Sequence, residues 1–177
     1  MTILPWTHAI ADMPAKSRDY TREASLNEMA AMATDLGLLG CSKLHAQYAI
    51  RAIGGGRYKL TGTLDATVTQ ACVITLEPIV STLKLPVDVE FSPDATNASP
   101  RKSSGDEGED VEVSSLPDVE PIENASLDVG RVVFETLAAG IDPFPKKPDA
   151  AFAWDDPRAA DPKSNPFAVL ANLKPKQ

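Results

Sequence analysis

The side chains that most often carry acid–base or nucleophilic chemistry are scarce in this chain. It has two histidines, His8 and His45, and two cysteines, Cys41 and Cys72. His45 alternates with apolar residues on the polar side of an expected strand, and neither cysteine has the cationic surroundings that activate a thiolate. The sequence contains no G-x-S-x-G, Walker A or G-x-G-x-x-G motif. We therefore expect no catalytic residues and no enzyme; a deep pocket holding His45 with Cys41 or a carboxylate would reverse that expectation.

Metal and cofactor sites are not expected either. The two cysteines lie 31 positions apart and form no C-x-x-C pair, which excludes a zinc ribbon and a thioredoxin-type redox motif. The acidic run at residues 106–110 lacks the ligand spacing of an EF-hand loop, so we interpret it as solvated. No small-molecule substrate is evident from the sequence.

The negative charge is concentrated in one segment. The chain of 177 residues carries a formal net charge of −8, which excludes a uniformly basic nucleic-acid binder. Residues 92–123 hold nine acidic and two basic residues, a net charge of −7. We expect residues 92–117, rich in Ser, Pro, Gly, Asp and Glu, to form a disordered acidic loop. It is either a solubilising linker or a decoy that competes with RNA for a basic partner.

Cations gather instead near an expected hairpin turn. Residues 16–59 hold seven basic and four acidic side chains. Arg51, Arg57 and Lys59 surround the glycine turn at residues 54–56, where they could contact phosphates while Tyr58 stacks on a base. Tyr58 is also in phase with the apolar face of its strand, so core packing is the other interpretation.

A second candidate contact region lies near the C-terminus. Phe167, Leu170 and Leu173 follow at helical spacing, next to Lys174. A short amphipathic helix of this kind suits a docking peptide. The alternative is a helix that packs on the protein's own sheet.

The elements that must position these residues follow from hydrophobic periodicity. A capping-box pattern at Ser25 and Glu28 predicts a helix over residues 22–36. Period-two alternation predicts a four-strand antiparallel meander. Its expected strands are residues 44–52, 58–68, 71–75 and 83–91. Asp128 is the expected N-cap of a second helix over residues 128–139.

The fold class expected from this pattern is α+β, an antiparallel meander packed with two main helices, and whether the sheet curls toward a barrel stays open. The expected organisation is an extended N-terminal arm (1–21), a helix plus sheet (22–91), the disordered acidic loop (92–117), a second helix with a Pro-rich segment of the same domain (118–148), and a loosely ordered tail with a short terminal helix (149–177). The first residues lack the basic and apolar regions of a signal peptide, and no run of 18 apolar residues occurs. We expect a cytoplasmic protein with no membrane contact.

Three blocks, at residues 70–78, 120–135 and 165–174, resemble a known bacterial family when taken in this order. The positions that carry the resemblance are Cys72, Glu77, Pro78, Asp128, Glu135, Asn165, Pro166 and Phe167. Over roughly residues 20–174 the chain resembles the YceD family, the large ribosomal RNA subunit accumulation proteins. The resemblance implies a bacterial cytosolic protein associated with 23S ribosomal RNA accumulation, and it implies no particular enzymatic activity.

One position departs from that family pattern. Many relatives carry a C-x-x-C pair in the first block, whereas this chain has Cys72 followed by Thr75. A metal site that requires both thiolates is therefore not expected here, and Cys72 alone supports a packing role.

These observations predict a non-enzymatic factor in large ribosomal subunit biogenesis. Its expected partners are 23S ribosomal RNA or a precursor of the large subunit, and a ribosomal protein. The contact candidates are Arg51, Arg57, Lys59, Phe167, Leu170 and Lys174. The alternative is a protein-interaction module or chaperone for a basic ribosomal protein, in which the acidic loop screens the client.

Overall fold

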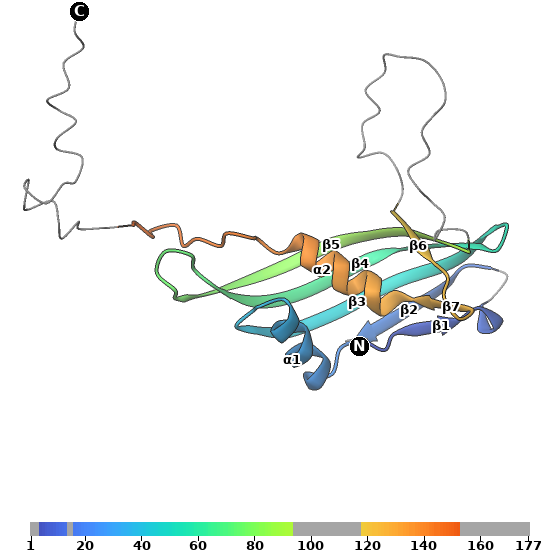
Figure 1. Ribbon diagram of the computed structural model, residues 1–177, viewed down its shortest axis with the longest axis horizontal. Coiled ribbons are helices and arrows are strands. Elements are labelled where there is room, and N and C mark those ends of the chain that lie inside the picture. The colour runs from blue at the N-terminus through green and yellow to red at the C-terminus, as the bar shows by residue number, and fades with distance from the viewer. Residues whose placement is uncertain (1–3, 14–15, 94–117, 153–177) are drawn as a thin grey trace, which may run out of the picture. The chain divides into compact units, whose positions relative to one another are not determined.

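The computed structural model describes residues 4–13, 16–93 and 118–152 (Figure 1). The chain divides into two compact units, Met1–Lys146 and Lys147–Gln177. In the second unit the described residues form one turn, in which the Ala150 backbone N–H donates to the Lys147 carbonyl over 3.1 Å.

Three strands of 15 residues each form the centre of the fold. They are β3 (Gly40–Gly54), β4 (Arg57–Ala71) and β5 (Pro78–Ser92), paired antiparallel in that order. The turn between β3 and β4 was expected at residues 54–56, and all three glycines there have positive φ angles of 62–89°. That backbone conformation strongly favours glycine, which explains why the hairpin reverses at this point.

The expected strand at residues 71–75 is wrong. β4 continues to Ala71, and residues 72–77 form the connection to β5. The Cys72 N–H donates to the Glu77 carbonyl over 2.8 Å, the Leu76 N–H donates to the Cys72 carbonyl over 2.9 Å, and Leu76 adopts a φ of 60°. These bonds close a turn where the apolar run suggested a strand, so the meander has three long strands rather than four.

The N-terminal segment is more structured than the arm expected over residues 1–21. It contains β1 (Thr7–Ala9), the 3-10 turn η1 (Ile10–Asp12) and β2 (Arg18–Glu23). β2 pairs antiparallel with β3, from Arg18 opposite Ile50 to Glu23 opposite His45. As an edge strand it has mostly exposed, polar side chains, which is why its sequence does not resemble a core strand.

Both expected helices exist, with caps at the expected residues. In α1 (Leu26–Asp35) the Ser25 hydroxyl accepts from the Glu28 N–H while the Glu28 carboxylate accepts from the Ser25 N–H, a complete capping box. α1 therefore begins four residues later than the expected start at residue 22, because β2 occupies residues up to Glu23. In α2 (Val129–Gly140) the N-cap Asp128 accepts from the Arg131 N–H over 3.0 Å.

Two short strands complete the fold. β6 (Asp118–Pro121) runs parallel to the end of β5, and β7 (Ser126–Asp128) pairs with β1 in a separate two-stranded sheet. The main sheet has the order β2-β3-β4-β5-β6 and is not closed into a barrel. The class is α+β, as expected, with a mixed rather than purely antiparallel sheet.

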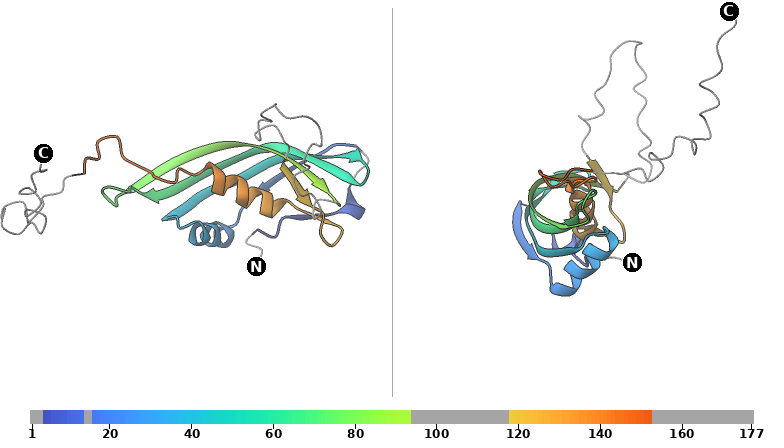
Figure 2. Two further views of the ribbon diagram at one scale, coloured as in Figure 1. Left: turned by 45° about the horizontal axis from the view of Figure 1, so that its top comes forward. Right: turned by 90° about the vertical axis from the view of Figure 1, so that its left-hand side faces the viewer.

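The sheet curves around α2, as the end-on view of Figure 2 shows. The core between them is largely aliphatic. Its largest fully buried side chains are Phe91, Leu4, Met32, Leu44, Ile50, Leu60, Leu64, Leu127, Leu137, Val68, Val129 and Val133. No helix in the described part of the chain has the length and apolar character needed to cross a membrane.

Candidate functional site

The expected basic tip lies where the sequence placed it, but most of its charge is paired. Arg57 donates to Glu90 over 2.9 Å, and Lys59 forms an ion pair with Asp88. Both carboxylates come from β5, which runs beside β4 in this register. Arg51 lies directly opposite Lys59 and has no ion pair within the described part of the chain. Arg51 is therefore the cation at the tip that is most available to a phosphate.

The first block of the resemblance forms the connection between β4 and β5. Cys72 is fully buried and is a free thiol. Its sulfur lies 3.5 Å from the Thr75 N–H, and Thr75 Oγ1 donates to the Glu77 carboxylate over 3.4 Å. Pro78 is the first residue of β5, and a strand tolerates proline at this position although proline has no N–H to donate. Cys72 therefore has a packing role, and the connection is a turn closed by hydrogen bonds.

The same connection meets the segment that follows α2. The Val73 N–H donates to the Pro145 carbonyl over 2.9 Å, and the Gln70 side-chain amide donates to the Asp142 carbonyl over 2.8 Å. The beginning of the Pro-rich segment is thereby held against the first block.

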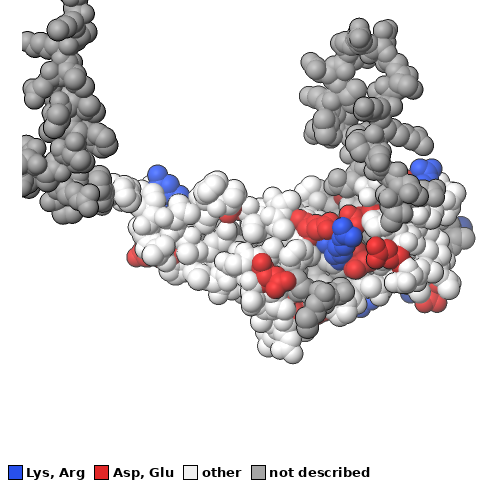
Figure 3. All heavy atoms as spheres, in the orientation of Figure 1, with Lys and Arg blue, Asp and Glu red and all other residues white. Residues whose placement is uncertain are grey.

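The second block gathers around one guanidinium. Arg131 of α2 donates to Glu135 over 2.9 Å and lies 3.5 Å from the Glu120 carboxylate. Figure 3 shows carboxylates on both sides of a cation over α2 and β6. The hydrogen bond to Glu135, together with the negative charges of Glu120 and Glu135, raises the pKa of Arg131 above its ordinary value. Asp128 and Glu135 thus serve the start of α2, as its N-cap and as a partner of Arg131.

A pocket of about 270 Å³ opens beside this guanidinium. Its lining includes the carboxylate side chains of Glu120, Glu123 and Asp128 together with Arg131. Three carboxylates against one cation leave the pocket acidic, so it suits a positively charged side chain better than a phosphate.

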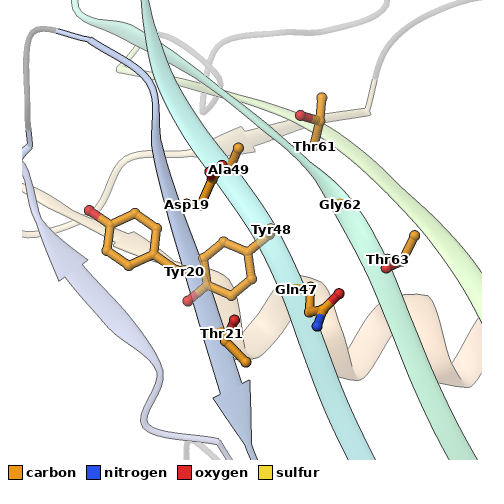
Figure 4. A pocket seen from close by; sticks show the side chains of 9 residues that line it. All are labelled: Asp19, Tyr20, Thr21, Gln47, Tyr48, Ala49, Thr61, Gly62 and Thr63. Carbon is orange, nitrogen blue, oxygen red and sulfur yellow. The ribbon is translucent and has the colours of Figure 1, made fainter.

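The most distinctive cluster was not expected from the sequence. His8 of β1, Tyr20 of β2 and Tyr48 of β3 pack against one another, and we call them, with Arg18 and Arg22, the tyrosine cluster. The Tyr20 and Tyr48 rings are stacked with centroids 5.6 Å apart, and the His8 ring lies 4.3 Å from that of Tyr20. Figure 4 shows the two tyrosines side by side. The cluster joins residues of three different strands, β1, β2 and β3.

Strand register explains why these residues meet. Tyr20 pairs directly with Tyr48, and Tyr48 pairs with Gly62 of β4. A Cβ at Gly62 would lie only 2.7 Å from the Tyr48 Cα and Cβ atoms. The absence of a side chain at Gly62 therefore allows the backbone of β4 to approach Tyr48 closely. A hollow of about 480 Å³ borders Tyr20, Tyr48 and Gln47 at this place.

Burial is the main cause of the pKa shifts of His8 and Tyr48, and it favours the neutral form of both side chains. His8 is 9% exposed, and its Nε2 is joined to the Tyr48 hydroxyl by a hydrogen bond of 2.8 Å. Burial, with the positive charges of Arg22 and Arg18, lowers the pKa of His8, so the ring is neutral at pH 7. Burial also raises the pKa of the Tyr48 hydroxyl, partly opposed by Arg22. His8 and Tyr48 therefore form a neutral, buried pair.

The two arginines of the cluster stay accessible. Arg18 and Arg22 are exposed on the edge strand β2, and the Arg18 guanidinium lies 5.4 Å from the Tyr20 ring centroid. A guanidinium held over an aromatic ring can contact a phosphate and stack on a base. Sequence reasoning missed this surface, although the alternation of Arg18, Tyr20 and Arg22 was a signal for a strand with all three on one face.

The remaining expected site residues lie outside the described residues. Asn165, Pro166, Phe167, Leu170 and Lys174 belong to residues 153–177, and all but the first two residues of the expected acidic loop belong to residues 94–117. The expected start of that loop at residue 92 is wrong, because Ser92 is the last residue of β5 and pairs with Pro121 of β6. Of the other residues considered for chemistry, His45 lies 3.9 Å from Asp65 and Cys41 is partly exposed. Among the described residues, no three His, Cys, Asp or Glu side chains are grouped so that they could hold a metal ion.

Comparison with known proteins identifies no relative. A scan against profiles of known protein families, a search of curated proteins and a search of solved structures each found no match.

Proposed function

We propose that the protein is a non-enzymatic, cytoplasmic factor in large ribosomal subunit biogenesis that supports accumulation of 23S ribosomal RNA by binding the RNA, a ribosomal protein or both. The resemblance of its three sequence blocks to the YceD family points to this process. The structural observation that carries the proposal is the tyrosine cluster, in which exposed Arg18 and Arg22 flank stacked tyrosines on an open sheet edge.

This cluster suits RNA for physical reasons. Arginine binds phosphate through a planar fork of donors and also stacks on bases, and single-stranded RNA exposes both groups. β2 is the edge of its sheet, so a strand of RNA can approach Arg18 and Arg22 from the open side. Arg51 follows Ile50, which pairs with Arg18, so the cluster and the basic tip lie at the same end of the sheet but on opposite faces, and an RNA strand that contacts both must pass around the edge at β2.

The charge of the chain limits the affinity of such contacts. A net charge of −8 and the ion pairs of Arg57 and Lys59 leave few cations to release counterions. With about three phosphate contacts, from Arg18, Arg22 and Arg51, the logarithm of affinity should fall with the logarithm of salt concentration with a slope of about −2. The protein should therefore bind a defined RNA site modestly rather than coat RNA.

The test is crosslinking and pull-down from growing bacteria, with RNA sequencing and protein identification from the same sample. Enrichment of 23S segments at direct crosslinks is expected for the unchanged protein. The variant Arg18→Ala with Arg22→Ala should lose these crosslinks, whereas the matched control Arg57→Ala, which removes a cation already paired with Glu90, should keep most of them. Equal crosslinking by all three proteins would remove the tyrosine cluster from the proposal.

A second candidate is a protein-interaction module or chaperone for a basic ribosomal protein. The observation that favours it is the acidic pocket of Glu120, Glu123 and Asp128, which could receive a lysine or arginine side chain. Enrichment of one ribosomal protein without RNA crosslinks would support this function. Deleting residues 94–116 then separates two roles of that segment: loss of client binding assigns it to the client, and unchanged binding leaves it as a linker.

A further inference from the structure

The outer edge of β5 is only partly covered. β6 pairs with Val89–Ser92, which are four of the 15 residues of β5. Along residues 78–88, no strand in the described part of the chain pairs with this edge. The open stretch forms the border of the sheet next to β6 in Figure 1. An open edge presents backbone donors and acceptors that can pair with another strand.

Alternation along the strand shows which backbone groups face outward. The Ser92 carbonyl accepts from the Ile122 N–H across this edge over 3.1 Å, so even-numbered residues of β5 point their backbone groups away from β4. Val80, Thr82 and Lys84 therefore present N–H and C=O groups with which no described strand pairs. Pro78 and Pro86 face the same way and have no N–H, so they bound this window on both sides.

We propose that this window pairs with the same window of a second copy of the chain, antiparallel, with the two-fold axis at Thr82. Thr82 lies midway between Pro78 and Pro86, so the axis places Pro78 of one copy opposite Pro86 of the other. Thr82 then faces Thr82, and Val80 faces Lys84 on each side. Each of these three pairs exchanges two backbone hydrogen bonds, which gives six bonds in total. At each end of this window Pro78 of one copy faces Pro86 of the other, and neither has an N–H to donate.

Other registers fit less well. If the axis moves to Ser81 or Leu83, a proline of one copy lies opposite Lys84 or Val80 of the other. Each such pair has one donor instead of two, and the proline ring separates the strands. The spacing of the prolines thus selects a single register, which a long uniform edge would not do.

The side chains agree with this register on both faces. On the concave face, half-buried Leu85 of one copy lies beside Ile79 of the other, and this contact occurs twice. A groove of about 410 Å³ between β5 and α2, lined by Leu85, Val87 and Ala139 among others, opens at this edge and would receive the Ile79 side chain. On the convex face Val80, which is 67% exposed, lies beside the stem of Lys84. No like charges face each other in the window.

The oligomeric state of the full chain in solution tests the proposal. We expect sedimentation equilibrium over about 5–500 µM to show a monomer–dimer equilibrium, since a small interface of this kind gives modest affinity. Thr82→Pro should weaken the dimer about 100-fold, because it removes two of the six donors and places two rings at the axis. Thr82→Ser is the matched control and should dimerise like the unchanged chain.

The fold should survive the proline. Thr82 faces the same side as Pro78 and Pro86, so its N–H takes no part in the ladder with β4, and circular dichroism of Thr82→Pro should match that of the unchanged chain. A crosslink gives an independent test: in a Cys41→Ser background, Thr82→Cys should form an intermolecular disulfide on oxidation, because residues facing each other in such a pair have Cα atoms about 5.5 Å apart.

Two results would overturn the proposal. One is a chain that stays monomeric over the whole concentration range and forms no crosslink through residue 82, which would leave the edge to a strand of a different protein. The other is a dimer that Thr82→Pro does not weaken, which would place the interface elsewhere. The proposal does not depend on the proposed function, so RNA crosslinking and dimerisation can fail separately.

Discussion

Removing the Tyr48 hydroxyl measures how much the buried hydrogen bond between His8 of β1 and Tyr48 of β3 stabilises the fold. Tyr48→Phe keeps the aromatic ring and its stacking on Tyr20, so the packing of the tyrosine cluster should not change. It deletes the buried 2.8 Å hydrogen bond to His8 Nε2 and also the hydrogen bond between the hydroxyl and the side chain of Arg22, which is exposed and keeps access to water. His8 is 9% exposed, so water has little access to replace the lost partner.

The expected loss follows from these contacts. A net hydrogen bond between neutral groups contributes about 1 kcal/mol, and leaving a buried polar atom unsatisfied costs about 1–3 kcal/mol. We therefore expect Tyr48→Phe to lower the free energy of unfolding by about 1.5–2.5 kcal/mol. Adding His8→Phe makes both partners apolar and should restore part of that loss, because no buried polar atom then lacks a partner.

Urea denaturation followed by circular dichroism measures these free energies, and the four chains form a double-mutant cycle. Tyr20→Phe is the matched control: its hydroxyl has no hydrogen bond within the described part of the chain, so it should change stability by less than about 0.5 kcal/mol. Equal stability of Tyr48→Phe and the unchanged chain, or strict additivity with His8→Phe, would refute the reasoning.

Further predictions concern protonation and packing. Because the pKa of His8 is lowered from its ordinary 6.5, the unfolded chain takes up the proton first, and stability should fall as pH drops below about 7, with a slope of at most about 1.4 kcal/mol per pH unit. His8→Gln should remove this contribution in urea titrations between pH 7.5 and 5.5 and His45→Gln should not; identical pH profiles would contradict the assignment. Gly130→Ala should destabilise by about 2–3 kcal/mol although alanine favours helices, because its Cβ would lie 2.0 Å from the Leu4 carbonyl oxygen; a gain in melting temperature would show that this contact is not rigid. Asp128→Ala should cost about 1 kcal/mol through loss of the α2 N-cap, and Asp128→Asn much less; equal thermal stability of both variants would argue against the cap.

The features that the sequence predicted are those determined by neighbouring residues. Ser25 with Glu28, and Asp128 before an apolar stripe, predicted two helix starts because a cap acts within one turn. The glycine turn at residues 54–56 predicted the hairpin for the same reason. The blocks quoted for the resemblance contain Asp128 and Glu135, both neighbours of Arg131, but they did not predict the pocket that Asp128 and Arg131 line.

The features that were missed depend on contacts between distant segments. β2 became a strand because β3 supplies its partner, and its own side chains, alternating Arg18, Tyr20 and Arg22, are those of a solvated surface. The run at residues 71–75 has the composition of a strand, yet the bonds between Cys72 and Glu77 turn the chain there. The tyrosine cluster needs the register of β2 on β3 and the arrival of β1, which no local pattern contains.

The pairing of β1 with β7 has a consequence for how the chain folds during synthesis. His8 and Ser126, joined through this small sheet, lie 118 residues apart in sequence. The meander can form from neighbouring hairpins as it emerges from the ribosome, whereas β1, although His8 can already meet Tyr20 and Tyr48, has no strand to pair with in the described part of the chain until β7 has been made. Trp6 can donate to Glu28 of α1 early, but until α2 has been made its carbonyl lacks the Gly130 N–H that donates to it over 3.0 Å. Docking of the first strand is thus a late event, and a chain that stops before α2 keeps its N-terminal segment open to degradation.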